Sequence, residues 1–168
     1  GNDLLLKVVS EIHDPVTTTD ELIPSGETSS FRSNPLGLAE FTLSRKDPAY
    51  VGRAKAVRDM NDEIKAEIKQ VVTALAKKDA DLGAKAASAQ IGSTIFACKP
   101  GDGSAREQAA SCQRVLGASA NIANEYATKR YRSNLINWGM LPFVYKDGDK
   151  NLPFANDDYV FIPEVRKM

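Results

Sequence analysis

The segment 92–145, GSTIFACKPGDGSAREQAASCQRVLGASANIANEYATKRYRSNLINWGMLPFVY, decides the fold because strand and helix patterns alternate along it. Short apolar stretches predict three strands, at 92–99, 118–124 and 140–145. The stretches between them predict two helices that each end at a glycine, 104–117 and 125–139. Strand–helix–strand repetition favours parallel pairing. The predicted fold class is therefore α/β, with a mixed or parallel sheet flanked by helices.

The two ends of the chain add strands to this sheet. DLLLKVVS (3–10) predicts a first strand, and DDYVFIPEV (157–165) predicts a last one. The segment 11–35 carries three prolines and many hydroxyl residues, which indicates a long loop of the kind that often serves function. LGLAEFTLSR (36–45) predicts a short helix.

The middle of the chain has a helical pattern. The segment 47–78 predicts helix throughout, with Pro48 in the first turn after an Asp47 cap. Its apolar face, which we expect to pack in the core rather than to bind a partner, consists of Ile64, Ile68, Val71, Val72 and Leu75. The pattern leaves open whether there is one helix or two, broken near 59–61. The small residues of 79–90 predict a connector.

The composition of the chain limits which binding partners and which cellular location we expect. The chain has 168 residues, enough for one domain (1–168) with a proper core, and its 22 basic residues balance 22 acidic ones. Zero net charge gives no electrostatic reason to expect a nucleic-acid partner. No apolar run approaches membrane-spanning length and the start lacks a basic leader, so we expect no membrane partner and a cytoplasmic location. Gly1 is either a cloning remnant or the start of a fragment.

Two cysteines, Cys98 and Cys112, are too few for a typical structural zinc site or a cluster. Cys98 is expected in a buried strand and Cys112 in a helix. Nothing in the sequence indicates an oxidising compartment, so both are expected to be reduced structural thiols. We therefore expect this chain to bind no metal.

A glycine loop stands between a predicted strand and a predicted helix, at Gly101 and Gly103. Such a loop presents backbone N–H groups and the positive end of the helix dipole to an anion. The sequence lacks GxGxxG, GxxxxGK[ST] and GxSxG, and with His13 as its single histidine a serine–histidine triad is a poor hypothesis. Ser104 at the helix mouth, beside Arg106, could instead accept a proton while the arginine grips a carboxylate. The alternative is that Ser104 caps the helix and Arg106 is solvated.

Three segments, in order, resemble the C-terminal swivel domain of the aconitase family. GDGSAREQAA (101–110) is similar to the family's G-x-G-S-S-R-[ED]-x-A-A. RVLGASANIANEYATKRYRSNLINWGMLPF (114–143) follows the family's L-G, strand, arginine-bearing helix, N-L and G-[LMV]-L-P. TTTDELIPSG (17–26) looks like the family's T-D-H-I-S-P-A-G, and Arg32 follows Asp20 at the family's separation. The resemblance implies a swivel domain with a sheet or barrel-like core.

The resemblance also implies roles, residue by residue. Ser104 matches the catalytic base, which removes a proton from a carbon of a polycarboxylate substrate. Arg106 and Arg32 match arginines that bind substrate carboxylates. Asp20 matches the aspartate that orients a catalytic histidine of another domain. Gly101 and Gly103 match the glycines of the loop backbone.

Two departures from the family pattern bear on the substrate. The family's second loop serine, a substrate contact, is Ala105 here, and the histidine after the aspartate is Glu21. Together with the long helical segment that begins at Asp47, they indicate a divergent hydratase branch.

The resemblance implies that a [4Fe–4S] cluster lies in other domains, so this chain is expected to be a piece of a larger hydro-lyase and inactive alone. Its partners would be a polycarboxylate and the cluster-bearing domains. One alternative is the small subunit of an isopropylmalate isomerase. Another is a non-catalytic or RNA-binding module, to which Arg130 and Arg132 could contribute.

Overall fold

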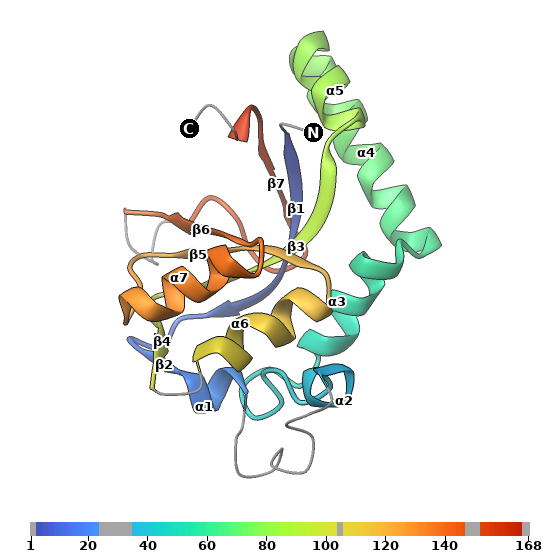
Figure 1. Ribbon diagram of the computed structural model, residues 1–168. Coiled ribbons are helices and arrows are strands. Elements are labelled where there is room, and N and C mark those ends of the chain that lie inside the picture. Colours follow the sequence, from blue (N-terminus) through green and yellow to red (C-terminus); the bar gives the residue numbers. More distant parts are fainter. Residues whose placement is uncertain (1–2, 24–34, 104–105, 147–151, 166–168) are drawn as a thin grey trace.

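A five-stranded sheet forms the centre of the computed structural model, which describes residues 3–23, 35–103, 106–146 and 152–165. The strand order is β6–β5–β3–β1–β7 (Figure 1). Their bounds are β1 Leu4–Ile12, β3 Gln90–Ala97, β5 Ala118–Ala123, β6 Leu141–Val144 and β7 Tyr159–Ile162. The first four in this order pair in parallel, and β7 runs antiparallel to β1. The predicted mixed α/β fold is confirmed.

Two very short strands form a second, separate pair. β2 (Thr17–Thr18) and β4 (Pro100–Asp102) lie in parallel beyond the carboxyl ends of β1 and β3. The sequence patterns predict loops for both segments. Their pairing positions the candidate site.

Seven helices occur in the described part of the chain, and those nearest the sheet pack on one face (Figure 1). They are α1 Thr19–Leu22, α2 Pro35–Ala39, α3 Tyr50–Asp59, α4 Asp62–Lys78, α5 Ala80–Ala87, α6 Arg106–Val115 and α7 Lys129–Asn137. The predicted helix 125–139 thus begins later than expected, at a Thr128 cap. Gly117 and Gly139 follow α6 and α7 with positive φ, as helix-ending glycines do.

The sheet buries apolar side chains on both faces, as parallel sheets do. The main core joins β1 and β3 to α3, α6 and α7, with Tyr50 and Tyr131 as its largest side chains. A smaller cluster joins Leu6 to Leu141 of β6 and Ile162 of β7. Because β6 and β7 are the opposite edges of the sheet, this shared cluster shows that the sheet curls.

The helical segment from Asp47 is broken in two. Met60 adopts a left-handed conformation at the end of α3, and Asn61 caps α4 by accepting a hydrogen bond from the Ile64 N–H. The predicted Asp47 cap was wrong: α3 begins at Tyr50, after Ala49. The Asp47 carboxylate instead accepts from Ser10 and pairs with Arg53.

The predicted connector 79–90 was wrong, because residues 80–87 form α5. Asp79 caps this helix by accepting from the Asp81 N–H. A Cβ at Gly83 would lie 2.5 Å from the Ala76 Cβ, so small residues let α4 and α5 approach closely. The pair projects from the sheet (Figure 1). Lys7–Glu67 (2.8 Å) ties α4 to β1, and Lys85–Glu164 (3.3 Å) ties α5 to the turn after β7.

Candidate functional site

The pairing of β2 with β4 brings the T-T-T-D segment against the glycine loop. Thr17 lies beside Pro100 and Thr18 beside Asp102 in the parallel register. The Thr17 N–H donates to the Lys99 carbonyl at 2.9 Å. Two segments far apart in sequence therefore share one site.

A capping box fixes the turn after β2. The Thr18 hydroxyl accepts from the Glu21 N–H at 3.2 Å, and the Thr18 N–H donates to Glu21 Oε1 at 3.1 Å. Thr-x-x-Glu is the sequence signature of this motif, so it could have been recognised without the structure. Glu21, which stands where the resembled family has histidine, therefore serves local structure here.

Glu21 also joins an ion-pair group at the rim of the site. Lys46 lies 2.9 Å from Glu21 Oε2 and also bonds Asp14. Burial would raise the pKa of Glu21, but hydrogen bonds from Lys46 and Thr18 outweigh it and lower that pKa. Glu21 is thus held as a carboxylate.

Asp20 lies in α1 with its side chain 52% exposed. Its Oδ2 accepts from Arg45 Nη1 at 3.0 Å. An ion pair this exposed contributes little to stability. The pair leaves the Asp20 carboxylate at the protein surface, where a group from outside this chain can reach it.

Two positions in the glycine loop require glycine, because their backbone conformation and close neighbours leave no room for a side chain. Gly101 has φ +102° and Gly103 has φ +128°. A Cβ at Gly101 would lie 2.4 Å from Tyr131 Cγ, and one at Gly103 would lie 2.4 Å from Thr19 Oγ1. The loop backbone is therefore packed against α7 on one side and against the start of α1 on the other.

Arg106 is the first residue of α6 and is half-buried. Its Nη1 donates to the Gly103 carbonyl at 2.9 Å, so the guanidinium folds back over the loop. A guanidinium has five N–H donors, so the same side chain can bond the loop and also donate to an anion. This arrangement suits a carboxylate held at the loop.

The predicted site residues fall into two groups. Asp20, Gly101, Gly103 and Arg106 lie on the elements that β2 and β4 bring together. Ser104, Ala105 and Arg32 lie outside the described residues, so their predicted roles stay predictions.

Four residues around this site were missed. Thr18 shapes the turn, Lys46 holds Glu21, and Thr128 and Tyr131 support the loop from α7. Only Thr18 carried a signal in the sequence, because the others reach the site through tertiary contacts.

The two cysteines do not suit a cluster. Cys112 is buried in α6, and burial raises the pKa of its thiol to about 11 against hydrogen bonds from Ser111 and Thr42. Cys98 follows β3 and is partly exposed. Among the described residues, no group of three or more His, Cys, Asp or Glu side chains could hold a metal ion.

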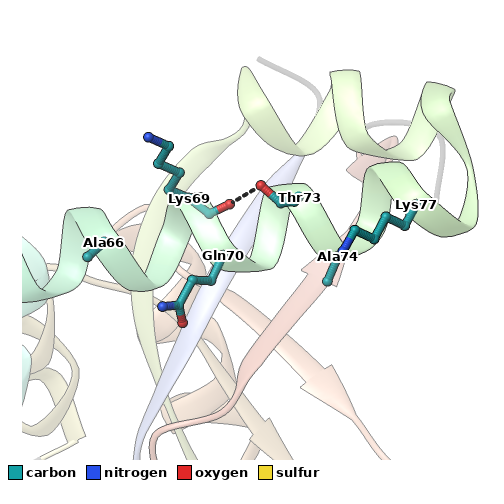
Figure 2. Close-up of a pocket in the computed structure, with 6 residues that line it drawn as sticks. All are labelled: Ala66, Lys69, Gln70, Thr73, Ala74 and Lys77. Carbon is teal, nitrogen blue, oxygen red and sulfur yellow. Dashed lines mark hydrogen bonds between the residues drawn. The ribbon is translucent and has the colours of Figure 1, made fainter.

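Hollows lined by described residues also lie outside the loop itself. A polar cleft of about 430 Å³ adjoins the rim at Lys46, and it is lined by Glu11, Ile12, His13, Asp14, Lys46, Asp47, Arg53 and Asn156. His13 lies 2.9 Å from Glu11 Oε1 at this cleft. An open hollow of about 470 Å³ runs along one face of α4 (Figure 2), lined by Ala66, Lys69, Gln70, Thr73, Ala74 and Lys77. Figure 1 places α4 well away from β4, so this second hollow has no part in the loop site.

Comparison with known proteins assigns the chain to a family. A family model described as the aconitase C-terminal domain matches residues 49–148. The match covers the glycine loop and Arg106, and Asp20 lies before it. No curated protein matches the sequence. Among the described residues, no helix is both long and apolar enough to cross a membrane.

Proposed function

Because this chain belongs to the aconitase C-terminal domain family, we propose that it is the swivel domain of an aconitase-like hydratase. Its substrate would be a hydroxy-polycarboxylate, which the enzyme dehydrates and rehydrates reversibly. The chain would be one part of a larger multidomain enzyme. The observation that supports this function is that Arg106 folds over a glycine loop that β2 holds against the Asp20 turn.

The chain's own residues would hold the substrate and accept a proton. Arg106 would bind one substrate carboxylate through its guanidinium fork. By the family resemblance, Arg32 would bind another and Ser104 would take a proton from a substrate carbon. Asp20, exposed on the same side as the loop, would meet a group of a neighbouring domain.

The described residues offer no ligand set for an iron–sulfur cluster. We propose that any cluster of the intact enzyme lies on other domains. The role assigned to this chain is therefore confined to substrate binding and proton transfer.

Titration of the chain with tricarballylate, an unreactive tricarboxylate, tests the proposal. We expect ¹H–¹⁵N NMR shifts at Gly101, Gly103 and the Arg106 side chain, and a much weaker response to acetate. Arg106→Gln should weaken binding roughly ten-fold to a hundred-fold, the range for a hydrogen bond to a charged group. Arg132→Gln, an exposed arginine of α7, is the matched control and should bind normally. Equal response to tricarballylate and acetate would contradict the proposed function.

A further inference from the structure

We propose that Thr128 is a positioning residue for the glycine loop, a role that rests on the function proposed above. Its single hydroxyl makes two hydrogen bonds. Oγ1 accepts from the Tyr131 N–H at 3.1 Å, which caps α7, and donates to the Gly101 carbonyl at 3.2 Å. A threonine hydroxyl has one proton, so the donor is committed to the loop while a lone pair serves the helix.

Thr128 completes a clamp on β4. One edge of β4 pairs with β2. On the other side, the Ala127 N–H donates to the Pro100 carbonyl at 3.0 Å, next to the bond from Thr128. Tyr131 packs its ring against Gly101 in the same place. The start of α7 therefore fixes the peptide groups that lead into the loop.

The start of α7 is itself fixed by a buried polar network. Tyr131 is fully buried, and its hydroxyl donates to Asn121 Oδ1 at 2.6 Å and accepts from Gln113 Nε2 at 2.9 Å. Asn121 Nδ2 donates to Gln113 Oε1 at 2.7 Å. The three side chains join α7, β5 and α6. A satisfied buried network of this kind holds its members in one arrangement.

Thr128 acts through the loop backbone on Arg106, the residue proposed to bind a substrate carboxylate. Gly101 and Gly103 both have positive φ, and glycines have wide conformational freedom unless neighbours restrict them. Thr128 restrains the Gly101 carbonyl, and two residues later the Gly103 carbonyl accepts from Arg106. Loss of the hydrogen bond from Thr128 should therefore increase the mobility of the Gly103 carbonyl, which accepts from the Arg106 guanidinium.

Three substitutions in the full chain separate loop positioning from helix capping. Thr128→Gly removes the hydroxyl, yet glycine is a fair N-cap. Thr128→Asp keeps a strong cap but cannot donate to the Gly101 carbonyl. Thr128→Ser keeps both bonds. The matched control is Asn61→Gly, which likewise removes the side-chain capping bond of α4, away from the loop.

We expect Thr128→Gly and Thr128→Asp to weaken tricarballylate binding roughly five-fold, the loss of one ordinary hydrogen bond, with little change in melting temperature. Thr128→Ser should bind within two-fold of the parent chain, and Asn61→Gly should bind normally. The ¹⁵N order parameters of Gly101 and Gly103 in Thr128→Gly should fall below the roughly 0.85 of rigid backbone, with or without the probe.

Several results would overturn the role of Thr128. Weaker binding in Thr128→Asp alone would mean that the added charge, not the lost bond, is responsible. Unchanged affinity and unchanged order parameters in Thr128→Gly would show that the hydroxyl only caps α7. If the parent chain does not bind tricarballylate, the proposed function fails, and the order parameters still decide whether Thr128 holds the loop.

Discussion

Gly101→Ala tests whether the loop is packed as tightly as the structure indicates. The substitution adds one methyl group at a residue with φ +102°. That methyl carbon would lie 2.4 Å from Tyr131 Cγ and 2.5 Å from both Tyr131 Cβ and Cδ2. Tyr131 is fully buried and its hydroxyl is hydrogen-bonded, so its ring cannot move away from the added methyl group without disturbing the core.

The expected loss of stability has two parts. A non-glycine residue in a sparsely populated backbone region costs about 1–3 kcal/mol. Overpacking a well-filled core costs about 1–3 kcal/mol more. The free energy of unfolding should therefore fall by about 2–6 kcal/mol. The melting temperature of a chain this size should fall by at least about 4 °C.

Two other glycines supply matched controls. Gly139 has φ +77° but no atom within 4 Å of an added Cβ, so Gly139→Ala should cost only the backbone strain, about 1–2 kcal/mol. Gly52 lies in α3 with ordinary backbone and open space, so Gly52→Ala should stabilise by about 0.5–1 kcal/mol. Urea unfolding followed by circular dichroism gives all three values. If Gly101→Ala costs no more than Gly139→Ala, the packing of Tyr131 on the loop is refuted.

Two further predictions concern titratable groups. The folded chain lowers the pKa of Glu21 below its ordinary value of 4.5, so below pH 4.5 the unfolded chain binds more protons and the free energy of unfolding falls as the pH drops. Urea midpoints measured from pH 7 downward should therefore fall less steeply in Glu21→Gln than in the parent chain. Identical slopes would contradict the lowered pKa. A thiol reagent such as 5,5′-dithiobis(2-nitrobenzoate) at pH 8 should label the partly exposed Cys98 quickly and Cys112 only on unfolding. The reason is that the Cys112 thiol is buried and its pKa is raised to about 11. Rapid labelling of both thiols in the folded chain would show that Cys112 is not shielded.

The alternation of strands and helices was predictable because each element carries its own pattern. The sheet from β1 to β7 follows from apolar runs, and Gly117 and Gly139 mark helix ends through their positive φ. Predictions from local sequence rules, such as helix capping, failed where a tertiary contact engages the side chain instead. Asp47 has the right chemistry for a cap, but Ser10 and Arg53 engage its carboxylate.

The segment 79–90 shows a different failure. Its small residues predict a connector, but the structure has a helix there, with Gly83 at the contact with α4. Gly83 can lie against Ala76 only because neither side chain is large. Composition alone does not distinguish a connector from a close helix contact.

The candidate site was predictable only in its separate segments. The glycine loop and the Asp20 turn each have a sequence signature, yet the two- and three-residue strands that join them are too short to predict. The support from Thr128 and Tyr131 depends on where α7 packs, which no local pattern specifies.

The placement of β1 inside the sheet has a consequence for how the chain folds during synthesis. Leu4 pairs with Gln90 on one side and with Ile162 on the other. Because β1 precedes both partners in the sequence, it leaves the ribosome first and must wait for β3, and then for β7, before both of its edges are covered. Such non-local pairing slows folding, and an open strand edge invites association with other chains. The nascent chain should accordingly need protection until residues 159–162 have emerged, and cutting the chain before them would leave one edge of β1 open.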